Sequence, residues 1–217
     1  MPIMNIFNSI EREIFEVPPV FNSSDQKKYF DFPIRIIRFM KTLRTPTNKV
    51  CFLVMFGYFK ASKRFFSKQF HQIDITFVAK MIGFSPNQIR IDAYEEATYR
   101  RHKKVILEYY GYREFAETAK QTVTNEISSM IRSQLKPKLI MLRIIEILIN
   151  QKIEIPSYPT LVNFIIDETK RHREKLNKII ESHLNPKIKK ILDALLDKED
   201  EQSSKVQRYK LTMLKKI

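Results

Sequence analysis

The sequence predicts an all-α fold, in which two helical modules with helix-turn-helix-like substructures are joined by a short hinge. Three of the 217 residues are glycine, so few positions suit the tight turns of β-hairpins. Leucine, isoleucine, lysine, glutamate and arginine are abundant, and most of these are strong helix formers. Apolar residues recur at spacings of three and four, as they do on one face of a helix. We expect residues 1–114 to form the first module and residues 115–217 the second.

Three short helices are expected at the start of the chain. Residues 1–20 contain an amphipathic helix that ends before Pro18. Ser23 and Gln26 are in capping-box register for a second helix, because their side chains can bond each other's backbone amides. Pro33 suits the beginning of a third helix.

The first long apolar run follows a break at residues 45–48, which also supplies a new N-cap. Residues 49–59 are nearly all apolar, which is typical of a helix surrounded by other helices. We expect this helix to be the core of the first module. Its Cys51 is the only cysteine of the chain and should be a buried thiol, so no disulfide framework is expected and a reducing compartment is favoured.

Residues 74–94 have the pattern of a helix-turn-helix. Residues 75–82 carry apolar side chains at i, i+3, i+4 and i+7. Gly83 then suits the left-handed conformation that ends a helix. Ser85 would cap a second helix over residues 86–91. In proteins that read DNA with this motif, the second helix lies in the major groove.

The exposed positions of this second helix carry amide, hydroxyl and guanidinium groups, which can read base edges. These positions are Ser85, Asn87, Gln88 and Arg90. Two short packed helices without a DNA-reading role would give the same pattern. In addition, Asp92 stands where the motif usually has its last apolar anchor, unless Ile91 serves instead.

A basic cluster opens the next predicted helix, which covers residues 97–111. Its position suits phosphate contacts beside a docked recognition helix. The cluster consists of Arg100, Arg101, His102, Lys103 and Lys104. Gly111 should end this helix, and residues 112–115 should form the hinge between the modules.

The second half repeats the order of an apolar helix, a turn and a helix with a basic body. A helix over residues 116–135 precedes a strongly apolar helix that starts at Pro137 and should be the second core. After a turn, Ser157 or Thr160 caps a long helix. Its expected core face is Leu161, Phe164, Ile165, Ile179 and Ile180, and its basic stretch is Lys170, Arg171, His172, Arg173, Lys175 and Lys178. Further helices are expected to begin at Asn185 and Ser203, with an acidic turn over residues 197–201 between them.

The net charge of +15 and a pI near 9.8 indicate a polyanionic partner, either nucleic acid or an anionic membrane surface. Residues 27–68 alone contain eleven Lys or Arg and one acid. The longest apolar run, residues 50–59, is too short to span a bilayer, and the N-terminus has no signal-peptide composition. We therefore expect a cytoplasmic protein.

No catalytic constellation is recognisable in the sequence. The four histidines are not paired at helical spacing, and a single cysteine cannot complete a zinc site with them. No glycine-rich phosphate loop and no serine elbow occur. We expect no catalytic residues, no metal and no cofactor.

Residues 31–115 resemble the N-terminal region of the Tn-three family of replicative transposases. The matching segments are RTPTNKVCFLVMFGYFK (44–60), FVAKMIGFSPNQI (77–89) with Tyr94 after it, and TYRRHKKVILEYYGYREF (98–115). The second half resembles the next part of the same proteins, in IPSYPTLVNFIIDETKRHRE (155–174) and LNPKIKKILDALLDKED (184–200). Cys51 departs from the family, which often has glycine there, and residues 65–73 are less typical.

This resemblance implies tandem helix-turn-helix-like modules that bind double-stranded DNA at the terminal inverted repeats of a transposon. The family's catalytic domain is a larger C-terminal RNase H-like unit with an acidic, magnesium-binding triad, which this sequence does not include. The resemblance therefore implies a bacterial, nucleoid-associated protein that binds DNA without cutting it, and no membrane partner. Self-association is left open for the full-length transposase.

The residues that the resemblance implies for DNA binding form four groups. Phosphate contacts are expected from Arg44, Asn48 and Lys49, base reading from Ser85, Asn87, Gln88 and Arg90, and clamping of the DNA backbone from Arg100, Arg101, Lys103 and Lys104. In the second module the corresponding residues are Tyr158, Thr160, Lys170, Arg171 and Arg173.

The alternative is a basic helical interaction module that binds protein partners, or binds nucleic acid or a membrane surface non-specifically. It is favoured if the basic side chains are scattered over the surface instead of lining one face. An enzyme is the third reading, and it lacks a recognisable site.

Overall fold

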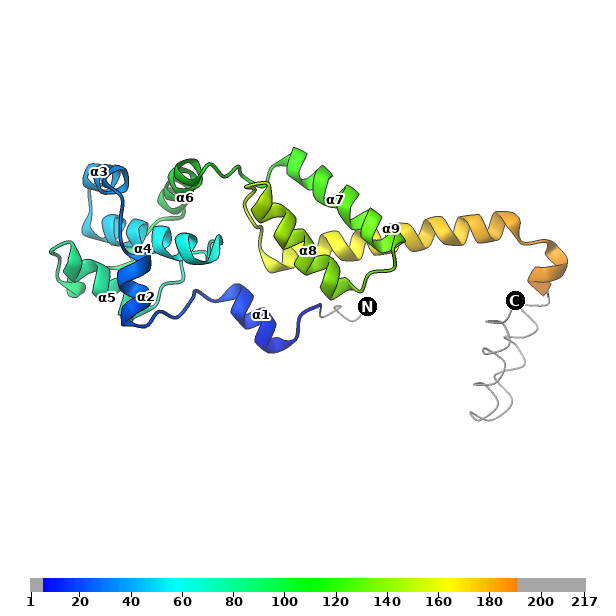
Figure 1. The fold of residues 1–217 in the computed structure, drawn as a ribbon, viewed down its shortest axis with the longest axis horizontal. Helices are drawn as coiled ribbons and strands as arrows, with labels where there is room; N and C mark the ends of the chain where they lie inside the picture. Colours follow the sequence, from blue (N-terminus) through cyan, green and yellow to red (C-terminus); the bar gives the residue numbers. More distant parts are fainter. Residues whose placement is uncertain (1–5, 191–217) are drawn as a thin grey trace. The chain divides into compact units, whose positions relative to one another are not determined.

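The computed structural model describes residues 6–190, and this part of the chain is helical without a β-strand (Figure 1). The prediction of an all-α fold is confirmed. The α-helices are α1 (Ser9–Glu16), α2 (Ser23–Tyr29), α3 (Ile34–Thr42), α4 (Pro46–Ser62), α5 (Gln72–Met81), α6 (Glu96–Tyr110), α7 (Glu117–Arg132), α8 (Pro137–Asn150) and α9 (Tyr158–His183). Two 3₁₀ turns, η1 (Pro86–Gln88) and η2 (Ile91–Ala93), lie between α5 and α6.

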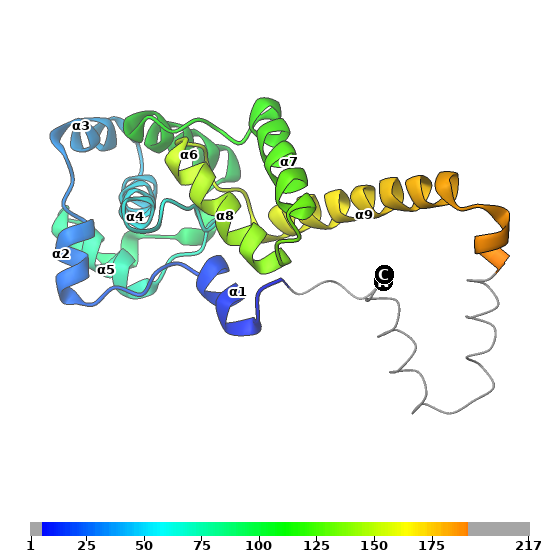
Figure 2. The same cartoon turned by 45° about the vertical axis from the view of Figure 1, so that its right-hand side comes forward.

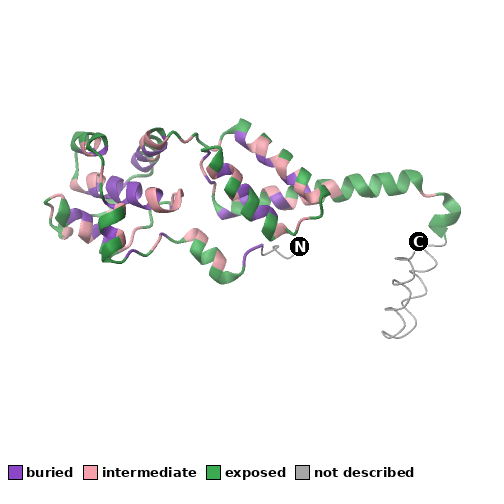
Figure 3. Cartoon of the chain, in the orientation of Figure 1, coloured by how far each residue is buried: buried purple, intermediate pink, exposed green. Residues whose placement is uncertain are grey.

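Helix α4 is the centre of the first hydrophobic core. Figure 2 looks nearly along this helix, with α2, α3, α5 and α6 around it. Every residue from Val50 to Phe59 is buried, and α4 is coloured accordingly in Figure 3. Because neighbours cover it on all sides, α4 needs no polar face, and the prediction of a core helix is confirmed.

Cys51 lies fully inside this core, as predicted. Burial raises the pKa of its thiol to about 12, because the thiolate would be poorly solvated there. The thiol is therefore protonated at neutral pH and packs as a small apolar side chain.

Gly57 gives α4 a close contact with the aromatic ring of Phe30. A Cβ atom placed on Gly57 would lie 2.4 Å from two carbons of that ring. Phe30 is itself buried and packs against Tyr58 and Phe77. The sequence therefore needs glycine at this helical position, although glycine is a poor helix former.

A buried polar network joins α2, α4 and α5. The carboxylate of Asp74, which is fully buried, accepts hydrogen bonds from Gln26 Nε2 and from the Tyr58 hydroxyl, both at 2.8 Å. The Tyr58 oxygen also accepts from the backbone N–H of His71 at 3.1 Å. These bonds satisfy a carboxylate that would otherwise be costly to bury.

The second hydrophobic core is formed by α7, α8 and the first half of α9, and it is mainly aliphatic. Its most buried residues are Val123, Ile127, Ile140, Met141, Ile144, Leu148, Ile153, Leu161 and Ile165. Ile6 and Phe7, at the start of the described chain, also belong to it. The prediction that the helix beginning at Pro137 is a core helix is therefore confirmed for one face, while Leu139 and Leu142 on α8 remain exposed.

The segment predicted to be a hinge is held in place. Arg113 N donates to Lys152 O and Glu154 N donates to Arg113 O, each at 2.8 Å. Tyr112 packs against the first core and Phe115 against the second. Residues 112–115 are therefore an ordered linker held by hydrogen bonds and packing, and not a free hinge. The proposed module boundary at residue 114 stays a prediction.

Helix ends agree with the sequence at several positions and disagree at the start of α2. Pro33 stands at the beginning of α3 as its N-cap, Thr45 in the predicted break caps α4, and Gly111 ends α6. The capping box of α2, however, uses Asn22 and Asp25 instead of Ser23 and Gln26. The amide oxygen of Asn22 accepts from two backbone N–H groups, and Gln26 is needed for the buried network.

Helix α9 is buried only at its beginning. Leu161 and Ile165 pack in the second core as predicted, and Phe164 is partly buried. Ile179 and Ile180 were expected on the same face, but they are 55% and 53% exposed, so this part of the prediction is wrong. Within the described part of the chain, the last buried residue of the helix is Glu168.

The chain separates into a compact unit of residues 1–169 and a second unit of residues 170–217. In the second unit, residues 170–183 continue α9 and residues 186–190 are again helical. The predicted helix from Asn185 is thus described in its first turn. The rest of that helix, the acidic turn at 197–201 and the helix from Ser203 lie outside the described residues.

Residues 6–190 contain no helix that is long and apolar enough to cross a membrane. In the same range, no three His, Cys, Asp or Glu side chains are grouped so as to hold a metal ion.

Candidate nucleic-acid interface

Three segments that are distant in the sequence meet around a surface pocket of about 310 Å³. They are the first turn of α4, the 3₁₀ turns between α5 and α6, and the first turn of α6. Three of the predicted DNA-binding residues, Asn48, Gln88 and Arg90, line this pocket together. The remaining lining residues are Thr45, Pro46, Thr47, Ala93, Glu95 and Thr98.

The segment after Gly83 does not form the predicted recognition helix. Gly83 has φ +82° and ends α5 as expected, and Ser85 with Pro86 opens a turn. That turn is a 3₁₀ helix of three residues, after which Ile89 and Arg90 are extended. The prediction of an α-helix over residues 86–91 is therefore wrong.

Burial explains why the helix does not continue. Ile89 and Ile91 pack against the first core, Arg90 between them is exposed, and Tyr94 is fully buried. This alternation suits extended backbone better than an α-helix, whose buried positions recur every three or four residues. Asp92 is exposed, and Ile91 is the residue that anchors the segment.

The predicted base-reading residues are nevertheless exposed. Ser85, Asn87, Gln88 and Arg90 all lie on the surface. Gln88 Oε1 accepts a hydrogen bond from Ser85 N at 3.2 Å. The structure therefore presents these side chains from an irregular turn.

The start of α4 carries the residues predicted to contact phosphate. The Thr45 hydroxyl caps the helix by accepting from Asn48 N at 3.1 Å. Arg44, which precedes the cap, is exposed, while Lys49 lies over the ring of Phe84 with its Nζ 5.7 Å from the centroid. Positive side chains thus stand beside a helix N-terminus, where backbone N–H groups attract anions.

The basic cluster of α6 divides by helical position into inward and outward residues. Arg100, Arg101 and Lys104 are exposed. Lys103 instead forms an ion pair with Glu154, with Nζ and Oε1 2.5 Å apart, and lies over the ring of Phe65. Lys103 is therefore engaged within the fold, whereas its three neighbours are available to a partner.

Arg101 also connects this cluster with the pocket. Its guanidinium donates to the hydroxyl of Thr98 at 3.3 Å, and Thr98 lines the pocket. Arg100 makes an exposed ion pair with Glu96, which is weak in water. Glu95 and Glu96 place negative charge at the same end of α6, so the surface is mixed there.

His102 is the fully buried member of the cluster. Its Nδ1 lies 2.7 Å from the hydroxyl oxygen of Tyr94, which donates to Met55 Sδ at 3.1 Å. Its Nε2 is buried without a hydrogen-bond partner within the described part of the chain. Burial, and secondarily the charge of Arg101, lowers the pKa of His102 to about 4, so the imidazole is neutral and structural at physiological pH.

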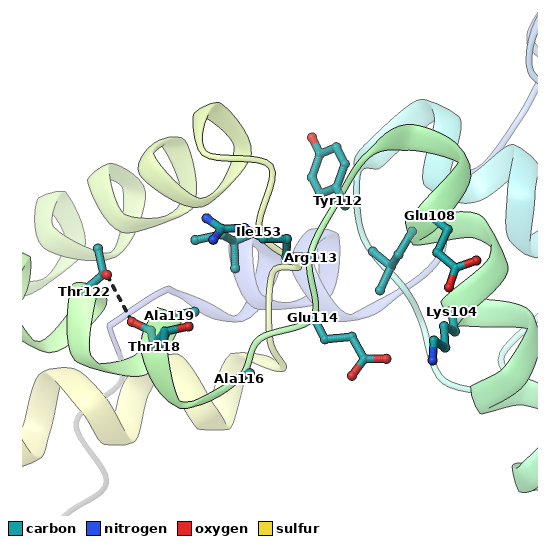
Figure 4. Close-up of a pocket in the computed structure, with 11 residues that line it drawn as sticks. Lys104, Glu108, Tyr112, Arg113, Glu114, Ala116, Thr118, Ala119, Thr122 and Ile153 are labelled. Atoms are coloured by element: carbon teal, nitrogen blue, oxygen red, sulfur yellow. Dashed lines mark hydrogen bonds between the residues drawn. The ribbon is translucent and has the colours of Figure 1, made fainter.

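A second surface pocket, of about 420 Å³, lies where α6 ends and α7 begins (Figure 4). Two basic residues, Lys104 and Arg113, and two acidic residues, Glu108 and Glu114, line it. Because its charges balance, this pocket offers no net attraction to a polyanion.

The second-half candidates are divided between the two units of the chain. Tyr158 is buried, stacks on Phe7 with centroids 5.5 Å apart, and accepts a hydrogen bond from Phe7 N. Thr160 is partly buried, and its hydroxyl oxygen lies 2.8 Å from the hydroxyl oxygen of Ser157. Lys170, Arg171 and Arg173 are exposed in the second unit. Tyr158 therefore has a packing role.

Part of the basic run over residues 27–68 is also used inside the fold. Lys60 Nζ donates to Lys28 O at 2.7 Å. Arg64 donates to Phe15 O at 2.6 Å and lies over the ring of Phe15. The number of basic residues in the sequence thus overstates the charge available to a partner.

Sequence reasoning missed two residues of the candidate site, Thr47 and Thr98. Both are buried and both accept hydrogen bonds from predicted DNA-binding arginines, Arg90 and Arg101. Threonines in helix starts are common, and neither shows a signal in the sequence beyond its neighbourhood.

Comparison with known proteins gives a family without a described activity. A family model with the description "Domain of unknown function (DUF4158)" matches residues 6–167, which include both hydrophobic cores and the pocket at α4. No curated protein sequence matches the chain. Because the family model covers most of its length, this chain belongs to the DUF4158 family.

Proposed function

We propose that this chain binds double-stranded DNA in a sequence-specific manner, as the N-terminal part of a Tn-three family transposase acting at transposon terminal inverted repeats. The observation that carries the proposal is the convergence of Asn48, Gln88 and Arg90 around one surface pocket. Amide and guanidinium groups are the side chains that most often read base edges. The sequence resemblance supplies the type of DNA.

Electrostatics supports a nucleic-acid partner. The net charge is +15, and the exposed Arg100, Arg101 and Lys104 lie on the helix whose first turn lines the pocket. These residues would hold phosphates and fix the register of the protein on DNA. Arg44 would do the same beside the start of α4.

Base reading would come from a turn instead of a helix. Residues 85–93 would enter a groove as an irregular segment, in which Asn87, Gln88 and Arg90 face the bases. The acidic residues Asp92 and Glu95 would limit how closely the flanks of this segment approach phosphates. Catalysis would belong to another domain of the full-length transposase.

The first experiment is a selection from a random-sequence duplex library, followed by binding of the enriched duplex, of the inverted repeat flanking the gene and of random DNA across a salt series. We expect the enriched duplex to match the repeat and to stay bound at salt concentrations that release random DNA. No enrichment, with equally salt-sensitive binding to all duplexes, would favour the non-specific interaction module.

Two single variants then test the residue roles. Arg90→Ala should lower affinity for the enriched duplex by about 1–3 kcal/mol, because a base contact is lost, and should change random binding little. Lys104→Ala should lower the affinity for all duplexes alike. It should also reduce the slope of log affinity against log salt concentration by about one, as for one lost phosphate contact. Leu142→Ala, at an exposed position of α8, is the control. Equal losses on enriched and random DNA for Arg90→Ala would contradict base reading.

A further inference from the structure

Few hydrogen bonds within the segment from Ser85 to Ala93 stabilise its conformation. Its internal backbone hydrogen bonds close two short 3₁₀ turns. In the first turn Gln88 N donates to Ser85 O and Ile89 N donates to Pro86 O, and in the second turn Ala93 N donates to Arg90 O. Short 3₁₀ turns are weakly stabilised by such bonds. The position of Arg90 must therefore be set by contacts with neighbouring helices.

Contacts with α4 hold the two flanks of this segment. Before it, the ring of Phe84 lies under the ammonium group of Lys49. After it, the hydroxyl of Tyr94 donates to Met55 Sδ. Between these flanks, the backbone N–H of Arg90 donates to the hydroxyl of Thr47 at 3.1 Å.

Thr47 is suited to act as a fixed acceptor. It is the second residue of α4, follows Pro46, and is 7% exposed. Threonine in a helix adopts mainly two χ1 rotamers, so the hydroxyl oxygen has few possible positions. The Arg90 amide therefore meets an acceptor whose place is set by the central helix of the first core.

We propose that Thr47 is a positioning residue that orients Arg90 toward DNA. Arg90 is extended, with φ −110° and ψ 97°, and its exposed side chain lines the same pocket as Thr47. Fixing its N–H on α4 restricts the direction of its Cα–Cβ bond, and less entropy is then lost when the guanidinium binds. This inference rests on the proposed DNA-binding function.

The test compares Thr47→Val with Thr47→Ser. Valine keeps the size of threonine but removes the acceptor, whereas serine keeps the hydroxyl. Thr122→Val is the matched control, because Thr122 is also a helical threonine but bonds its own helix at Thr118 O. Each variant is measured for binding to the enriched and random duplexes, for thermal stability, and for hydrogen exchange at the Arg90 amide.

We expect Thr47→Val to expose the Arg90 amide to exchange and to lower the preference for the enriched duplex about fivefold, as for one lost neutral hydrogen bond. Thr47→Ser should restore both properties, and Thr122→Val should alter neither. Random binding should be unchanged throughout, because phosphate contacts are kept.

Two results would overturn the inference. The preference for the enriched duplex could be unchanged in Thr47→Val, or Thr47→Ser could lose as much as the valine variant. If the parent protein prefers no duplex at all, the proposed function fails and so does a base-reading role for Arg90. In that case, hydrogen exchange at the Arg90 amide still tests separately whether Thr47 holds residues 85–93 in place.

Discussion

The two hydrophobic cores of residues 6–169 are built in different ways. The first surrounds α4 with aromatic rings and encloses polar groups, among them Asp74, Tyr58 and His102. The second is mainly aliphatic and places one face of α8 against α7 and α9. The second core also contains directional bonds, from Phe7 N to the Tyr158 hydroxyl and from the Ser128 hydroxyl to the Glu168 carboxylate, but the most buried side chains that fill it are mainly aliphatic. The candidate DNA-binding pocket lies on the first core.

The largest effect should come from emptying either core. Leu53 and Leu148 are both fully buried, one in each core. Leu53→Ala and Leu148→Ala should each destabilise the fold by about 2–5 kcal/mol, through lost burial and a residual cavity. Chemical denaturation measures this, and exposed Leu176→Ala should cost far less.

The same variants also test whether the cores unfold together. They are connected by the Lys103–Glu154 ion pair and by the backbone bonds of Arg113. We expect one transition, in which tyrosine fluorescence and far-ultraviolet circular dichroism coincide. Two separate transitions, with Leu148→Ala shifting only one of them, would show that the cores are independent.

The next largest effect is a pH dependence of the free energy of unfolding, which arises from His102 in the first core. Because the folded pKa of His102 is about 4 and the ordinary value is 6.5, the unfolded chain binds its proton more readily. The contribution of neutral His102 to the free energy of unfolding is fully present above pH 6.5. It is lost as the pH falls toward 4, and the loss is about 3 kcal/mol at most. His102→Gln should flatten the stability profile between these values. An unchanged slope in the variant would mean that His102 binds its proton equally well in the folded and the unfolded chain.

A smaller effect is expected from the buried carboxylate. Asp74→Ala leaves Gln26 Nε2 and the Tyr58 hydroxyl without their acceptor and should destabilise by about 1–3 kcal/mol. Asp74→Asn keeps one acceptor oxygen and should lose less, as equilibrium denaturation can measure. An alanine variant as stable as the asparagine variant would argue against the network as a source of stability.

Comparison of the two basic clusters shows what charge patterns can predict. Arg100–Lys104 and Lys170–Arg173 look alike in the sequence, yet the first contains a buried histidine and an ion-paired lysine. Helical periodicity identifies which residues share a face, but it does not say which face a neighbour covers. The partner of Lys103, Glu154, is fifty-one residues away, so local pattern could not reveal the pair.

The predicted recognition helix failed for a related reason. Gly83, Ser85 and Pro86 were placed correctly, because glycine and proline have conformational preferences that do not depend on distant residues. Whether the next residues continued as a helix depended on burial of Ile89 and Ile91 against the first core. Packing outweighed the local preference there.

The amino-acid sequence was sufficient to predict the helical class, the central helix α4, the buried Cys51 and several helix ends, such as the end of α6 at Gly111. These follow from composition, apolar periodicity and capping chemistry, which act within a few residues. Three other findings required the folded structure: Asn48, Gln88 and Arg90 share a pocket, Thr47 accepts a hydrogen bond from Arg90 N, and Tyr158 is buried. Those outcomes depend on contacts between residues far apart in the chain, and such contacts form only when the cores are packed.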